Sequence, residues 1–142
     1  MERRKKMSTP IRPEVSEKNR YWISRHRYYE LKHFCLQYND WKRAAQSLSM
    51  YPETHIEYPA GANCSNPVPT KVELLDRYKA RIEMVERAAK EADPELSSYI
   101  LDGVTQGHPY NYLHMRTDIP CCKETYYDRY RRFFWLLSQA RQ

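Results

Sequence analysis

The chain has 142 residues, which suits one domain or two small ones, and 24 basic against 18 acidic residues give it a formal net charge of +6. Its 4 cysteines are too few for a disulfide scaffold, and no apolar run is long enough to cross a bilayer. A basic, membrane-free, cytoplasmic chain is therefore expected, with nucleic acid as a candidate partner.

The first segment, residues 1–18, is predicted to be a disordered basic arm. It carries Arg3, Arg4, Lys5 and Lys6 and has almost nothing to bury. No apolar run follows these basic residues, so a secretory signal is not expected. Such an arm can contact phosphates or simply keep the chain in solution, and the sequence does not choose between these roles.

Residues 19–92 are predicted to form two long amphipathic helices joined by a proline-rich loop at 51–69. The chain holds only 3 glycines, and strand-like alternation is hard to find, which favours an all-α fold. The first helix should run from about 21 to 48, with Asn39 and Asp40 as candidates for a kink or cap. Apolar residues recur along it at spacings of three and four: Leu31, Phe34, Tyr38, Trp41, Ala45 and Leu48.

The second helix is predicted from about 70 to 92. Thr70 and Glu73 have the spacing of a capping box, in which each side chain binds the backbone N–H of the other residue. One face carries Val72, Leu75, Ile82, Val85 and Ala89. Two such helices make either a helical hairpin or a surface for self-association, and both remain open.

Residues 93–142 are predicted to be a helix-turn-helix domain. Asp93 and Pro94 should start a helix at about 95–104, ended by Gly103 and Gly107. Pro109 then opens a short helix, and Ile119 anchors the following turn. The side chains expected to face inward from the short helix are Tyr112, Leu113 and Met115.

The last helix, at about 121–139, is the predicted recognition helix. Its buried stripe should comprise Tyr126, Tyr130, Phe133 and Leu137. The opposite face near its start should present Lys123, Glu124, Tyr127, Asp128 and Arg131. In a docked helix-turn-helix, side chains near the start of the second helix reach base edges in the major groove.

The run from Ile119 to Arg132 resembles the recognition helix of sigma-factor region 4-like proteins, and more narrowly that of phage late-transcription regulators of the ArpU/RinA group. Their motif has an apolar residue and Pro, then Ser, a basic residue, any residue, Thr, an aromatic residue and Tyr. Here Cys122 replaces the Ser, Lys123 and Thr125 take the basic and Thr places, and Tyr126 and Tyr127 form the aromatic pair.

The resemblance covers about residues 94–139. It implies a regulator of phage or prophage type that binds promoter DNA in the cytoplasm of a bacterial host, with RNA polymerase as a further candidate partner. In that setting Thr125, Arg129 and Arg132 would hold phosphates. Base edges would be read by Lys123, Glu124, Tyr127 and Arg131, and Asp128 completes the predicted DNA-binding set.

No catalytic arrangement is found in the sequence, so an enzyme is not expected, and neither is a cofactor. The one metal-like group is His108, His114, Cys121 and Cys122, but it lacks the usual Cys-x₂₋₄-Cys pair, and no metal site is predicted. Two alternative functions stay open. One is a DNA-packaging subunit similar to a phage small terminase, and the other is a helical protein-interaction module.

Overall fold

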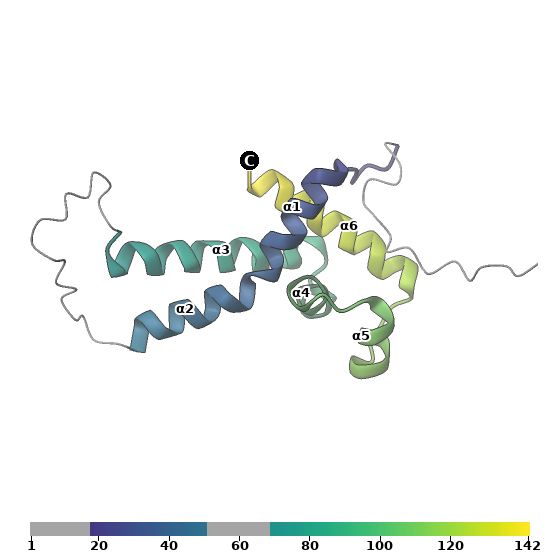
Figure 1. Cartoon of the computed structure of the whole chain (residues 1–142). Helices are drawn as coiled ribbons and strands as arrows, with labels where there is room; N and C mark the ends of the chain where they lie inside the picture. The colour runs from purple at the N-terminus through teal and green to yellow at the C-terminus, as the bar shows by residue number, and fades with distance from the viewer. Residues whose placement is uncertain (1–17, 51–68) are drawn as a thin grey trace, which may run out of the picture.

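A computed structural model describes residues 18–50 and 69–142. These residues form six helices and no strand, as Figure 1 shows: α1 (Arg25–Leu36), α2 (Tyr38–Met50), α3 (Lys71–Ala92), α4 (Ser97–Gln106), α5 (Tyr110–Thr117) and α6 (Lys123–Ala140). The predicted all-α class is confirmed for this part of the chain. The basic arm predicted at 1–18 and the loop predicted at 51–69 lie almost entirely outside the described residues.

The single helix predicted from 21 to 48 is wrong, because α1 and α2 are separated at Gln37. The Gln37 N–H donates to the Phe34 carbonyl at 3.2 Å, three residues back instead of four. Such a tightened turn ends the regular ladder. The bend lets one apolar stripe serve two neighbours, because α1 packs against α4 and α6 whereas α2 packs against α3.

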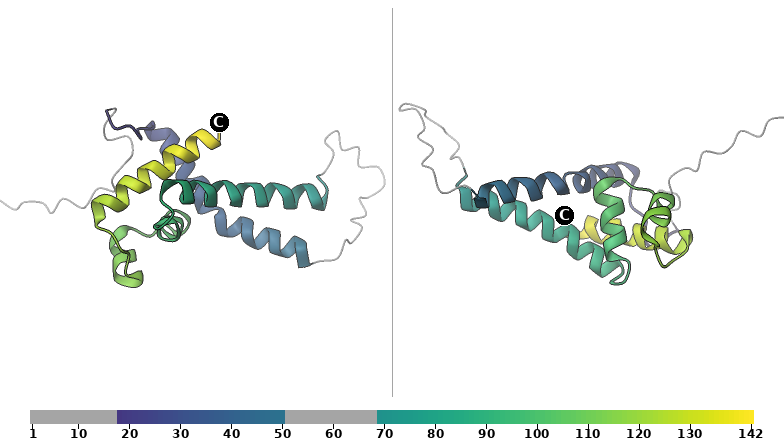
Figure 2. Two further views of the ribbon diagram at one scale, coloured as in Figure 1. Left: turned by 180° about the vertical axis from the view of Figure 1, so that it is seen from behind. Right: turned by 90° about the horizontal axis from the view of Figure 1, so that it is seen from below.

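The helix α3 begins as predicted, and its capping box is confirmed. The Thr70 hydroxyl accepts a hydrogen bond from the Glu73 N–H at 3.2 Å, and the Glu73 carboxylate accepts one from the Thr70 N–H, also at 3.2 Å. The helices α2 and α3 lie side by side and run in opposite directions (Figures 1 and 2), which confirms the hairpin-like pair. Val72 does not join the buried face, since its side chain is 58% exposed.

The core lies where α1, α4, α6 and the end of α3 meet (Figure 2). Its largest fully buried side chains are Tyr126, Phe133, Phe134, Leu31, Ile100, Leu113, Leu137, Val85 and Cys35. Aromatic rings meet edge to face there: the centroids of Phe133 and Phe134 are 5.0 Å apart. Such contacts add to the gain from burying the rings. The stripe predicted on α6 therefore does face the core, with Tyr130 half-buried at its edge.

The turn before α4 is capped by Asp93, as expected, but α4 starts later than predicted. One Asp93 carboxylate oxygen accepts hydrogen bonds from the backbone N–H groups of Glu95, at 2.9 Å, and Leu96, at 3.3 Å. Gly107 ends α4 in the left-handed region with φ 75°. Gly103 does not end the helix, as the sequence suggested. It lies inside α4, where an added side chain would collide with the Tyr126 hydroxyl.

The short helix α5 places fewer side chains inward than predicted. Leu113 is buried and Ile119 anchors the following turn, as expected, but Tyr112 is 39% exposed and Met115 is 84% exposed. Tyr110 is buried in their place. The reason is length: α5 makes only about two turns, so one side chain per turn meets the core.

Candidate nucleic-acid interface

The helix α6 is fixed by contacts along much of its length. Near its middle, the Tyr28 and Tyr130 hydroxyls form a hydrogen bond of 2.8 Å. At its end, the Arg27 guanidinium donates to the carbonyl oxygens of Ser138, at 3.0 Å, and Arg141, at 3.1 Å. These carbonyls carry the negative end of the helix dipole, which favours a cation. The core and α1 therefore hold α6 in one orientation.

The first turn of α6 remains open to solvent. Lys123, Glu124 and Thr125 are exposed, and Lys123 makes no ion pair with any residue in the described ranges. Cys122 precedes the helix, and its sulfur lies 3.2 Å from the Thr125 hydroxyl oxygen. This hydrogen bond lowers the pKa of the Cys122 thiol. A free cation and hydroxyl thus stand at the start of a rigid helix.

The two consecutive arginines of α6, Arg131 and Arg132, are half-buried. Neither forms an ion pair with another residue of the described part of the chain. An arginine side chain packs its stem on the protein while its guanidinium stays in water. Both groups are therefore free to bind an anion.

Arg129 and Asp128, in contrast, are already paired within the protein. The Arg129 Nε lies 3.3 Å from an Asp93 carboxylate oxygen, and its Nη1 lies 3.6 Å from one of Asp128. Arg129 is also only 35% exposed. The structure thus uses this arginine to tie α6 to the turn before α4, a contact that the sequence gave no means to anticipate.

The prediction that Tyr127 lies on the face opposite the core is wrong. Tyr127 is half-buried, and its ring meets Tyr126 and Tyr130 edge to face at centroid distances of 5.1 Å and 5.7 Å. Its hydroxyl accepts a hydrogen bond from the Tyr110 N–H at 3.4 Å. Favourable ring–ring packing with its neighbours draws Tyr127 inward.

The exposed side of α5 adds residues that the sequence did not single out. Asn111, Tyr112, His114 and Arg116 are all exposed. The Arg116 guanidinium lies 5.8 Å from the centre of the Tyr112 ring, four residues earlier. That spacing places both side chains on one face of the helix, away from buried Leu113, and it could have indicated them.

The second half of α6 is less accessible than its start. The Tyr21 and Trp135 rings lie 5.8 Å apart, so the segment before α1 contacts this part of the helix. The accessible surface near the helix-turn-helix is therefore made by the first turn of α6, the arginines that follow it and the outer side of α5.

The histidines and cysteines near this surface serve the fold. His108 Nδ1 lies 3.5 Å from an Asp102 carboxylate oxygen, and the Cys121 carbonyl accepts a hydrogen bond of 2.7 Å from the Tyr110 hydroxyl. Across residues 18–50 and 69–142, no three His, Cys, Asp or Glu side chains are grouped as metal ligands would be. In the same ranges no helix has the length and apolar character needed to span a bilayer.

Comparison of the chain with family models, curated protein sequences and solved structures finds no match.

Proposed function

We propose that this chain is a sequence-specific DNA-binding regulator of phage or prophage type, without enzymatic activity, that reads the major groove with the start of α6. The observation that carries this proposal is the division of α6 into a buried face and an exposed basic start. Tyr126, Phe133 and Leu137 lie inside the core, whereas Lys123 and Thr125 lie outside it. A groove-reading helix needs side chains that are accessible but held on a rigid support.

The exposed residues suit the two kinds of contact that such a helix makes. Lys123 and Arg131 can donate to guanine O6 and N7, and Glu124 can accept from a cytosine amino group. Thr125 and Arg132 suit phosphate oxygens, as does Arg116 on α5. The proposal leaves out Tyr127, Asp128 and Arg129, because contacts within the protein occupy them.

The resemblance of residues 119–132 to regulators of the ArpU/RinA group supports the same function. It places the protein in the cytoplasm of a bacterial host, on promoter DNA and near RNA polymerase. The net charge of +6 is in keeping with a polyanionic partner.

A second candidate is a DNA-packaging subunit similar to a phage small terminase, and one feature favours it. We call residues 42–50 of α2 and 71–84 of α3 the arm: it projects from the core (Figure 1), and none of these residues is buried. Its apolar side chains are only half-buried, among them Leu48, Leu75 and Ile82. Two helices with an incompletely covered apolar side suit self-association.

Selection of bound duplexes from a random pool at physiological salt tests the proposed function. A regulator should enrich one sequence motif, whereas binding that follows charge alone should enrich none. The oligomer mass in solution, measured by light scattering, separates the two candidates. A monomer or dimer with an enriched motif supports the regulator, and a ring of many subunits supports the packaging subunit. Absence of duplex binding would contradict both.

A further inference from the structure

A pocket lies between α1, α6 and the link from α4 to α5. Its volume is about 110 Å³. A cavity of roughly 150 Å³ can hold benzene, so this pocket, which opens to solvent, is of the size to take a single ring. None of the proposed DNA-contacting residues lines it. Binding here is thus a property separate from DNA binding.

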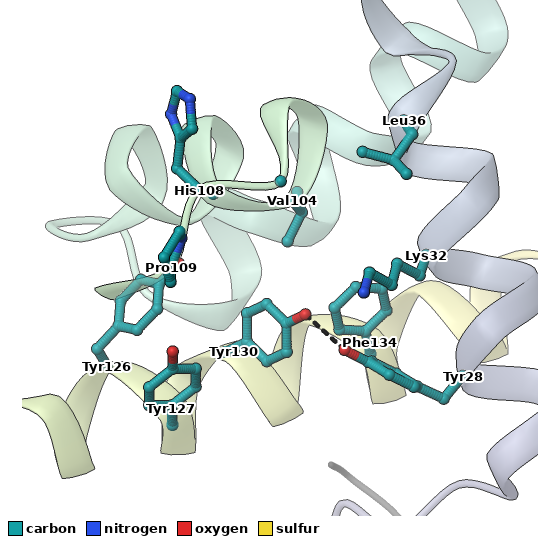
Figure 3. A pocket seen from close by; sticks show the side chains of 12 residues that line it. Tyr28, Lys32, Leu36, Val104, His108, Pro109, Tyr126, Tyr127, Tyr130 and Phe134 are labelled. Carbon is teal, nitrogen blue, oxygen red and sulfur yellow. Dashed lines mark hydrogen bonds between the residues drawn. The ribbon is translucent and has the colours of Figure 1, made fainter. Parts of the chain in front are cut away.

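Most of the pocket wall is apolar or aromatic. Leu36, Val104, Pro109 and Phe134 contribute to it, together with tyrosine rings from α1 and α6 (Figure 3). Leu36 is 38% exposed, which is unusual for a leucine beside a core. A wall of this kind favours a ligand with a flat apolar body.

One side of the pocket carries a cation. Lys32 is half-buried and forms no ion pair with the described residues. Figure 3 places its ammonium group beside the ring of Phe134, near the hydrogen-bonded hydroxyls of Tyr28 and Tyr130. An ammonium group next to hydroxyls in a partly dehydrated pocket attracts a carboxylate more strongly than one in open water does.

The other side carries an unsatisfied hydroxyl. Tyr126 is 1% exposed, and its hydroxyl oxygen has no hydrogen-bond partner in the part of the chain that the structure describes. Burial raises the pKa of Tyr126, so the hydroxyl keeps its proton and can donate. Figure 3 shows Tyr126 and Lys32 on opposite sides of the pocket, with Tyr130 between them. A buried polar group without a partner destabilises a protein unless a ligand or water satisfies it.

We infer that this pocket binds a small aromatic carboxylate that carries a second polar group opposite its carboxylate, as a 4-hydroxybenzoate does. Lys32 holds the carboxylate, the apolar walls hold the ring, and Tyr126 donates to the second polar group. The pocket has one lysine and is small, so a nucleotide fits it poorly.

Calorimetric titration of the full chain, without DNA, tests this assignment with 4-hydroxybenzoate, benzoate and neutral benzyl alcohol. We expect 4-hydroxybenzoate to bind most tightly and benzyl alcohol at least about tenfold more weakly than benzoate, because only the carboxylates pair with Lys32. Lys32→Gln should abolish the preference for benzoate over benzyl alcohol. Lys79→Gln, at an exposed position on α3, should leave it unchanged.

The variant Tyr126→Phe tests the inner end of the pocket. It should remove the preference for 4-hydroxybenzoate over benzoate while the unliganded variant melts at a higher temperature than the natural chain, because an unsatisfied hydroxyl is gone. Water as the only occupant would appear as no saturable binding of any probe, and that result would overturn the assignment. Equal binding of benzoate and benzyl alcohol, or binding insensitive to Lys32→Gln, would overturn it as well.

Discussion

The arm and the first turn of α6 both project from the same core, but their surfaces differ in chemistry. The arm presents half-buried apolar side chains, whereas the first turn of α6 presents Lys123, Glu124 and Thr125. An incompletely covered apolar surface favours another protein surface, and a short polar surface on a rigid helix favours a polar ligand such as DNA. The core thus supports two regions that can be altered separately.

Truncation of a core ring should give the largest effect and damage both regions. Phe134 is fully buried, so Phe134→Ala should lower the free energy of unfolding by about 3–5 kcal/mol. Leu75→Ala in the arm should cost about 1 kcal/mol, because the leucine is only half-buried. Urea denaturation measures both values. Similar losses for the two variants would mean that the arm is as well packed as the core.

The junction between the two regions depends on a hydrogen bond from α2 to α3. The Tyr38 hydroxyl donates to a Glu86 carboxylate oxygen at 2.5 Å. Tyr38→Phe should therefore cost about 1–2 kcal/mol, since a half-buried carboxylate loses its donor. Tyr99→Phe on α4 is a matched control, because no hydrogen bond of its hydroxyl is found among the described residues. Equal stability of the two variants would show that the junction does not depend on this bond.

Removal of the capping box should affect the arm alone. Thr70→Ala should cost about 1 kcal/mol, and the loss should appear as faster amide hydrogen exchange in the first turns of α3. Exchange of the core amides in α6 should not change. Faster exchange throughout the chain would instead indicate that the arm and the core unfold together.

The sequence predicted the fold best where one local signal was sufficient. The capping box at Thr70 and Glu73 is such a signal, and so is the ring stripe of α6. The break at Gln37 was not predicted, because nothing in the residue itself forbids a helix. It follows from α1 and α2 packing against different neighbours, and this information lies elsewhere in the chain.

The candidate interface could be predicted only in part, for a related reason. Helical periodicity placed Lys123 and Arg131 outside the buried stripe, and they do lie away from its centre. Periodicity could not reveal that Arg129 pairs with Asp93, which is far from it in the sequence, or that tyrosine packing draws Tyr127 inward. It also gave no sign of the pocket, which joins three separate segments.

Cysteine reactivity gives the smallest but most local comparison of core and surface. The hydrogen bond with Thr125 lowers the pKa of Cys122, so more of its reactive thiolate exists at a given pH. Burial raises the pKa of Cys121 and of Cys35. Alkylation by iodoacetamide, mapped by mass spectrometry, should therefore modify Cys122 first and Cys35 last. Thr125→Ala should move the pH dependence of Cys122 labelling to higher pH, and an unchanged profile would contradict this role of Thr125.

The central claim, that the start of α6 reads duplex DNA, is tested most directly by fluorescence anisotropy on the selected duplex over a range of salt concentrations. Arg131→Ala should weaken binding by about 1–3 kcal/mol and relax the preference at one base pair, while Arg132→Ala should reduce the salt slope by about 0.9. Arg77→Ala, exposed on the arm, should leave the affinity and preference unchanged. Equal affinity of all three variants and the natural chain for every duplex at every salt concentration would contradict the claim.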